Sequence, residues 1–288
     1  MTTSAAPAPA PIEFGALFTR SWELFKRNWI VALPPIVAGF LAIVVIGAFT
    51  VAAAVGAVAT NAAHNAWRDY AEWAIGCSLV VFLLLVVIGL WAQIATYAMA
   101  DAAWARGTTT FDDAFAAFWS RAGAVLVAWI GTAGVAVLAL ILVLPTLGLS
   151  MIGLTLVTMY VLPAAIAGKR GGFEAIGESF TLIRRFFVPS LVTWLGLYAI
   201  QYGLTFLIYG AIVPLQISVP TWSNSAMQMP PFPLLALSGG SFGIFALALF
   251  AYVGFSAIVQ VGLYRDLSAQ PELPPPVQTT LPPTAPTT

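Results

Sequence analysis

The stretch 15–29, GALFTRSWELFKRNW, decides the architecture because it returns later in the chain as 173–187, FEAIGESFTLIRRFF. The aligned pairs are Ser21 with Ser179, Trp22 with Phe180, Leu24 with Leu182, Lys26-Arg27 with Arg184-Arg185, and Trp29 with Phe187. A weaker third copy, FDDAFAAFWSRAGAV, occupies 111–125. Each copy precedes a pair of long apolar runs, so the chain consists of three units, each a short helix followed by an out-and-back helical hairpin.

Each copy is predicted to form an amphipathic helix at a membrane surface. In 14–29 the apolar stripe at helical spacing is Phe14, Phe18, Trp22 and Phe25, and the charged side carries Arg20, Glu23 and Arg27. In 173–187 the stripe is Phe173, Ile176, Phe180 and Ile183. Such a pattern is too polar to span a bilayer and typical of a helix that lies in the interface. The alternative, a soluble amphipathic helix packed on a domain, would need a soluble domain that the sequence does not offer.

The composition places the chain in a membrane. It has 288 residues, of which 60% are hydrophobic and 8% charged, whereas an average soluble domain carries roughly 25% charge. The uncharged apolar runs are long enough for helices that cross the hydrocarbon core, which takes about 20 residues. We expect six spans, at about 30–58, 75–100, 123–144, 147–168, 188–213 and 240–263. The predicted fold is an all-α, polytopic helical membrane protein of six transmembrane helices, paired as three hairpins.

The segments at the two ends of the sequence differ from this core. Residues 1–12 and the Pro/Thr-rich residues 269–288 are predicted to be disordered tails around a membrane domain at 13–268. The repeat units are about 14–100, 111–168 and 173–264. Since the first thirteen residues contain no Lys or Arg, we expect the first apolar run to be kept as a span and not removed as a signal peptide.

The basic residues predict the orientation. Ten of the eleven lie on one side of the predicted spans: Arg20, Lys26, Arg27, Arg106, Arg121, Lys169, Arg170, Arg184, Arg185 and Arg265. Only Arg68 lies on the other. The positive-inside rule then predicts a multi-pass protein of the cell (inner) membrane with both termini in the cytoplasm. Asp101, at the cytoplasmic end of the second span, is expected within reach of Arg106.

The repeated copies and two further stretches give the chain a family resemblance. The two stretches are LPTLGLSMIGLTLVTMYVLPAAIAGKRGGFEAIGESFTLIRR at 144–185 and VGLYRDL at 261–267. Over about 12–268 the chain resembles the membrane domain of glycerophosphoryl diester phosphodiesterases and related uncharacterised bacterial integral membrane proteins. The resemblance implies a helical membrane domain in a lipid-metabolising setting. The enzymes of that family carry a separate barrel domain for hydrolysis, whereas only a short tail follows Asp266 here, so no catalytic residue is carried over.

The sequence lacks the usual signs of catalysis. His64 is the only histidine, Cys77 is the only cysteine, and no G-x-S-x-G, P-loop or HExxH pattern occurs. The net charge is zero, with no basic stripe for a nucleic acid. We therefore expect a non-enzymatic protein without cofactor, metal site or nucleic-acid partner, whose partners are membrane lipids and either another membrane protein or a second copy of itself.

Two sets of polar residues are candidates for function. The first could contact anionic lipid headgroups at the cytoplasmic surface: Lys26, Arg27, Arg121, Lys169, Arg170, Arg184 and Arg185. Ordinary positive-inside charge is the alternative for these residues. The second set, Gln93, Gln201 and Gln260, lies within spans, either as hydrogen bonds between helices or as the lining of a polar cavity. The predicted function is a scaffold or lipid-associated membrane domain. The alternatives are a permease-like carrier of an amphiphilic molecule and an accessory subunit of a separately encoded enzyme.

Overall fold

The computed structural model describes residues 13–62, 67–217 and 232–270, and these ranges consist of helices and short connections, with no strand. The helices are α1 (Phe14–Arg27), the 3-10 helix η1 (Trp29–Ala32), α2 (Leu33–Ala62), α3 (Trp67–Arg106), α4 (Phe111–Ile141), α5 (Leu149–Thr158), α6 (Val161–Ile166), α7 (Gly172–Arg185), α8 (Phe187–Ile217) and α9 (Phe232–Ser268). Within these ranges, six segments are long and apolar enough to cross a membrane. The predicted all-α fold with six spans is confirmed. The predicted tail at 1–12, the predicted tail at 269–288 except its first two residues, and His64 lie outside the described residues. Ala269 and Gln270 are described, and their N–H groups donate to the carbonyls of Arg265 and Leu267 at the end of α9.

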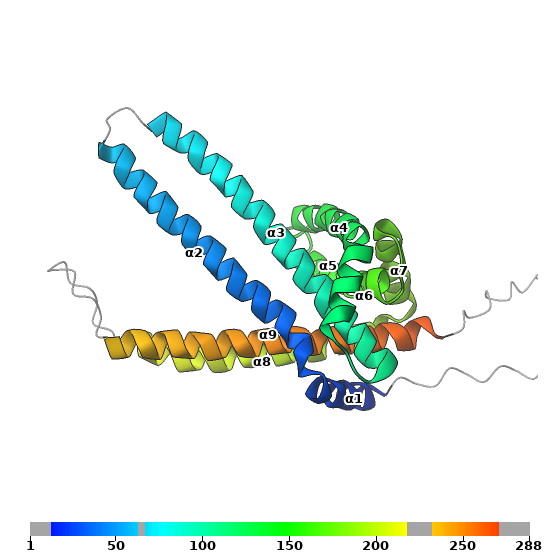
Figure 1. Cartoon of the computed structure of the whole chain (residues 1–288). Coiled ribbons are helices and arrows are strands. Elements are labelled where there is room, and N and C mark those ends of the chain that lie inside the picture. The colour runs from blue at the N-terminus through cyan, green and yellow to red at the C-terminus, as the bar shows by residue number, and fades with distance from the viewer. Residues whose placement is uncertain (1–12, 63–66, 218–231, 271–288) are drawn as a thin grey trace, which may run out of the picture.

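Two long hairpins diverge from a shared end of the molecule (Figure 1). One consists of α2 and α3, the other of α8 and α9, while α4 to α7 gather beside the end at which the hairpins meet. There α9 packs against both α2 and α3. At a rise of about 1.5 Å per residue, the 40 residues of α3 extend ~60 Å, twice the hydrocarbon core, so α3 must tilt or reach beyond the headgroups.

The second unit departs from the predicted pattern. Residues 111–125 were expected to form a separate interfacial helix, but they are the first turns of α4, which continues to Ile141. Proline explains the difference. Pro34 and Pro35 lie in the first turn of α2 and Pro189 in that of α8, where each can start a helix but cannot continue the one before it. No proline occurs in 111–141, so the amphipathic copy and the span join into one helix.

The fourth span is also not one helix, because it breaks between α5 and α6. Pro163 lacks an N–H, and its ring excludes a regular turn around the carbonyl four residues earlier, at Met159. The buried Ser179 of α7 satisfies backbone groups at the break: its hydroxyl accepts from Tyr160 N–H at 3.3 Å and donates to the Val157 carbonyl. Ser179, which aligns with Ser21 of the first copy, therefore has a structural role in the third unit.

The apolar stripe of α1 packs partly against other helices and is partly exposed at the surface. The rings of Phe18, Trp22 and Phe25 surround Phe255 of α9, with centroids 5.9–6.3 Å away. Phe18 also approaches α8, where a Cβ added at Gly196 would lie 3.0 Å from its ring. The most buried side chains of α1 are Leu17 and Ser21, one position away from the predicted stripe. The helix is thus anchored to the last hairpin and does not only rest on lipid.

Candidate functional site

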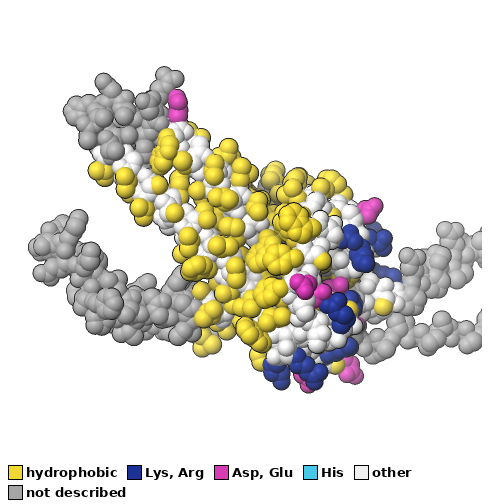
Figure 2. Space-filling model, in the orientation of Figure 1, with side chains coloured by type: hydrophobic (Ala, Val, Ile, Leu, Met, Phe, Trp, Pro, Cys, Tyr) yellow, Lys and Arg dark blue, Asp and Glu magenta, His cyan; other side chains and the backbone are white. Residues whose placement is uncertain are grey.

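Charged side chains gather at the end of the molecule where α1, α7 and the last turns of α3 and α9 meet, here called the basic end. Figure 2 shows Lys and Arg at this end of the visible face, with hydrophobic side chains covering the helices beyond it. Arg20 lies over the Trp104 ring, 4.5 Å from its centroid, and Trp104 Nε1 donates to the Ile258 carbonyl at 2.7 Å. These contacts connect α1, α3 and α9 at the basic end.

Asn28 closes the end of α1. Its Nδ2 donates to the carbonyls of Leu24 and Gly107, both at 3.0 Å, and its Oδ1 accepts from Thr109 N–H at 3.0 Å. The side chain is almost fully buried. A single amide therefore holds the end of α1 to the connection between α3 and α4.

The ion pairs at the basic end differ from the predicted ones. Asp101 was expected near Arg106, but it pairs with Arg265 of α9, whose Nη2 and Nε lie 2.6 and 2.9 Å from Asp101 Oδ1. Arg106 instead donates to Asp113, at 2.6 Å, and the Asp113 carboxylate also accepts from the N–H of Thr110, the N-cap residue of α4, in a capping box. Arg106 is therefore paired within the α3–α4 connection, whereas Asp101 joins α3 to α9.

A cavity of about 540 Å³ lies between α7 and the end of α9. Its lining residues include two cations, Arg170 and Arg185, and two anions, Glu174 and Glu178. Arg170 Nε donates to Glu178 at 2.6 Å, and this hydrogen bond raises the pKa of the guanidinium above its ordinary value. Tyr264 donates to the other oxygen of Glu178 at 2.7 Å. The cavity therefore has balanced charge, and Arg170 is already neutralised by its partner.

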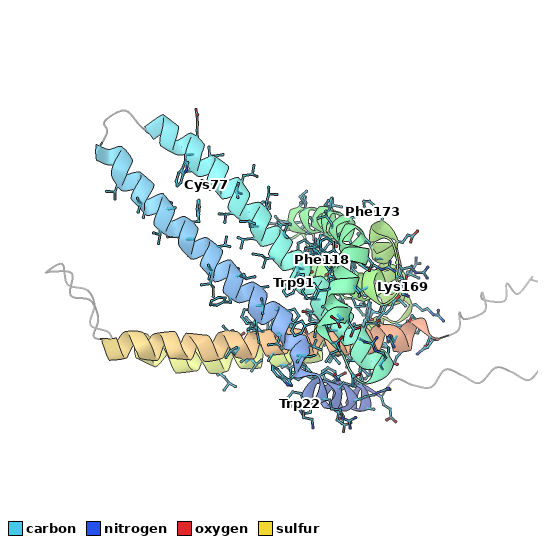
Figure 3. The ribbon with its side chains drawn as sticks, in the orientation of Figure 1. Trp22, Cys77, Trp91, Phe118, Lys169 and Phe173 are labelled. Atoms are coloured by element: carbon cyan, nitrogen blue, oxygen red, sulfur yellow. The ribbon has the colours of Figure 1, made fainter. Side chains whose placement is uncertain are left out.

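The structure separates the seven predicted lipid contacts into two groups. Around α7 lie Arg121, Lys169, Arg170, Arg184 and Arg185, and at the end of α1 lie Lys26 and Arg27. Arg121 donates to the Lys169 carbonyl at 3.2 Å, so its charge is directed toward the protein. No hydrogen bond or ion pair within the described ranges joins Lys26 or Arg27 to the α7 group. Figure 3 shows the separation: Trp22 on α1 and Lys169 beside α7 lie on different sides of the basic end.

Both amphipathic helices expose large aromatic side chains. Trp22 of α1 is 50% exposed, and Phe173 and Phe180 of α7 are 68% and 55% exposed. Each helix ends with two basic residues, Lys26-Arg27 or Arg184-Arg185. An exposed aromatic face with cations in the last turn is typical of a helix at the boundary between acyl chains and headgroups.

A second cavity, of about 290 Å³, lies among the spans and is called the polar pocket here. Its lining comes from α3, α5, α8 and α9 and the break after α5: Tyr97, Thr155, Thr158, Met159, Trp194, Leu197, Tyr198, Gln201, Tyr252 and Gln260. Tyr97 Oη donates to Gln260 Oε1 at 2.6 Å, and Tyr252 Oη donates to the Leu197 carbonyl at 2.9 Å. Tyr198 stacks on Trp194 with centroids 4.7 Å apart.

The three span glutamines divide between the two predicted roles. Gln93 accepts a hydrogen bond from Trp129 Nε1 at 2.8 Å and so joins α3 to α4. Gln201 and Gln260 line the polar pocket. The sequence left both roles open. Whether a glutamine lines the pocket depends on the break at Pro163 and on the packing of α8 against α9, and helical periodicity predicts neither of them.

Comparisons assign the chain to no known group. No family model, curated protein or solved structure matches it. Within the described ranges, no group of three or more His, Cys, Asp or Glu side chains is placed to hold a metal ion. The basic end and the polar pocket are therefore the two candidate sites of this protein.

Proposed function

We propose that the protein is a non-enzymatic, lipid-associated protein of the cell inner membrane that collects anionic phospholipid at its basic end. The observation that carries the proposal is the pairing, on α1 and on α7, of exposed aromatics with a basic last turn. Lys26, Arg27 and Arg184 make no hydrogen bond or ion pair with another described side chain, so their charge is available to a headgroup. Each such cation near an anionic surface contributes about 1 kcal/mol, and Arg suits phosphate oxygens because of its planar donors.

The resemblance to the membrane domain of glycerophosphoryl diester phosphodiesterases supports the same proposal. A membrane domain of that type, without hydrolytic residues of its own, would organise lipid or a partner protein. The proposed orientation has both termini in the cytoplasm, because the basic end then faces the side that positive charge favours.

The double substitution Arg184→Gln/Arg185→Gln tests the headgroup site. We expect roughly thirtyfold weaker retention of phosphatidylglycerol, since two cations together contribute about 2 kcal/mol, measured by native mass spectrometry from mixed-lipid nanodiscs. The control Arg184→Lys/Arg185→Lys keeps the charge and should retain most of the lipid. Unchanged retention in the Gln variant would leave positive-inside charge as the only role of these residues.

Cysteine labelling tests the orientation. Cys77 lies in the half of α3 away from the basic end (Figure 3) and is replaced by Ser as the background. In that background, a cysteine at Gly171, beside α7, should react with a membrane-impermeant maleimide only after the cells are permeabilised. A cysteine at Asn65 should react in intact cells. Labelling of position 171 from outside would overturn the cytoplasmic placement of the basic end.

A second candidate function is a permease-like carrier of an amphiphilic molecule. The polar pocket among the spans favours it, because polar side chains at membrane depth commonly mark the path of a substrate. The two functions differ in transport. A carrier would speed the exchange of a fluorescent lipid between the leaflets of reconstituted vesicles, whereas a lipid-associated scaffold would leave the protein-free rate unchanged.

A further inference from the structure

We propose that the polar pocket binds the uncharged, hydroxyl-bearing head of an amphiphile dissolved in the membrane. This site uses none of the cations of the basic end, so it stands or falls independently of the anionic-lipid proposal.

The lining is polar without being charged. It contains hydroxyl, amide, indole and thioether side chains together with Leu197, but no Asp, Glu, Lys, Arg or His. A phosphate or an ammonium group would enter without a counter-ion, which is costly at membrane depth. A hydroxyl group, in contrast, both donates and accepts hydrogen bonds, as the amide and hydroxyl groups of the lining do.

Two amide groups in the pocket have unused hydrogen-bonding capacity. Gln260 accepts from Tyr97, but its Nε2 makes no hydrogen bond with a described residue. The whole side-chain amide of Gln201 likewise has no hydrogen-bond partner in the described part of the chain. Within a bilayer no bulk water satisfies such groups, so a polar ligand that reaches them gains hydrogen bonds with little competition.

The pocket opens between α5 and α8 toward the lipid-facing surface. Thr155 of α5 and Tyr198 of α8 are exposed at its rim, whereas Met159, Leu197 and Tyr97 lie deeper. A ligand would therefore enter sideways from the bilayer and leave its chains among the lipids. The stacked Trp194 and Tyr198 rings offer a flat face on which the carbon atoms beside a hydroxyl group can pack.

The depth and size select a small head group. Gln260 precedes Arg265, at the basic end, by about 7 Å along α9, and Tyr97 precedes Arg106 by about 13 Å along α3. The site thus lies on the apolar side of these charged turns, in the half of the spans nearer the basic end. Its volume of about 290 Å³ is enough for a glycerol-sized group.

Photolabelling in nanodiscs tests the proposal. The probe is a diacylglycerol with a diazirine beside its glycerol group, in phosphatidylcholine, and a phosphatidic acid probe with identical chains is the charged comparison. We expect the diacylglycerol probe to label peptides of α5 and α8 that line the pocket, and the phosphatidic acid probe to leave them unlabelled. Excess unlabelled diacylglycerol or a long-chain isoprenoid alcohol should compete, and the stronger competitor identifies the source of the hydroxyl group. Competition by neither would overturn the proposal.

The variant Gln201→Leu removes the ligand contact without removing a bond of the fold. Since Gln201 has no partner among the described residues, the variant should unfold at the same temperature as the native protein or a higher one. Labelling of the pocket should fall roughly tenfold, the factor that ~1.4 kcal/mol represents. Gln93→Leu is the matched control, because it makes the same chemical change on α3 outside the pocket lining and should keep full labelling. Equal labelling of Gln201→Leu and native protein, or labelling spread evenly over the lipid-facing helices, would refute the site.

Discussion

Replacing Gly172 by Ala is expected to lower the free energy of unfolding by about 1–3 kcal/mol, the usual cost of overpacking a tight contact. Gly172 is the first residue of α7, and a Cβ there would lie 2.6 Å from both the Ala124 carbonyl oxygen and Val127 Cβ of α4. The first is a backbone atom and the second is a Cβ whose position the backbone fixes, so neither can move away by side-chain rotation. The methyl group therefore moves α7 off α4, and the thermal unfolding midpoint in detergent micelles should fall.

Gly177→Ala is the matched control because it makes the same change on the same helix. A Cβ at Gly177 meets nothing within 4 Å, so the substitution should be neutral or stabilise by up to about 1 kcal/mol through helix propensity. If the two variants unfold at the same temperature, close packing of α7 on α4 does not contribute to stability as the structure implies.

Replacing Asn28 by Ala is expected to cost about 3 kcal/mol. The substitution removes three hydrogen bonds in a buried place and leaves the Gly107 carbonyl and Thr109 N–H without their partner; bonds of this kind contribute roughly 1 kcal/mol each, and buried groups left unpaired cost more. The unfolding midpoint should fall, and the connection between α3 and α4 should become more sensitive to protease, since Asn28 holds it to α1.

Two comparison variants separate this effect from general sensitivity to substitution. Ser120→Ala removes a hydroxyl that bonds only to carbonyls of its own helix, and it should stay within about 0.5 kcal/mol of the native protein. Asn28→Asp keeps the acceptor for Thr109 but places a carboxylate oxygen against the two carbonyls, so it should be as damaging as Asn28→Ala. An Asn28→Ala protein as stable as Ser120→Ala would contradict the assigned role.

The sequence predicted the spans well because apolar runs alone determine which segments enter a bilayer. The predicted and observed ends differ mainly through helix extension beyond the membrane, as in α3, which begins at Trp67 where the predicted span begins at 75. Hydropathy cannot show such extension, because polar turns continue a helix without any change in backbone geometry. The absence of proline in 111–141 indicates that 111–125 and the third span form one helix. Aligning 111–125 with the other two copies draws attention away from this difference, because those copies are followed by proline.

The site was less predictable than the spans, because its geometry depends on which helices meet. The basic residues were identified from the sequence, but their pairing was not: Asp101 reaches Arg265, 164 positions away, instead of the nearby Arg106. In the sequence, Ser179 is only a position that aligns with Ser21. The structure shows that its hydroxyl accepts a hydrogen bond from the Tyr160 N–H at the break near Pro163. Local patterns specify helices, whereas the contacts that shape both cavities join residues far apart in the chain.

The packing of α1 on α9 has a consequence for biosynthesis. The aromatic rings of the first helix surround Phe255, which the ribosome adds only after almost the whole membrane domain has been made. At ~5–20 residues per second, α1 waits roughly ten to forty-five seconds for that partner. During this interval its exposed aromatics and basic last turn can keep it on the membrane surface. The amphipathic character that suits α1 to lipid contact in the finished protein would then also protect the nascent chain from aggregation until the last helix arrives.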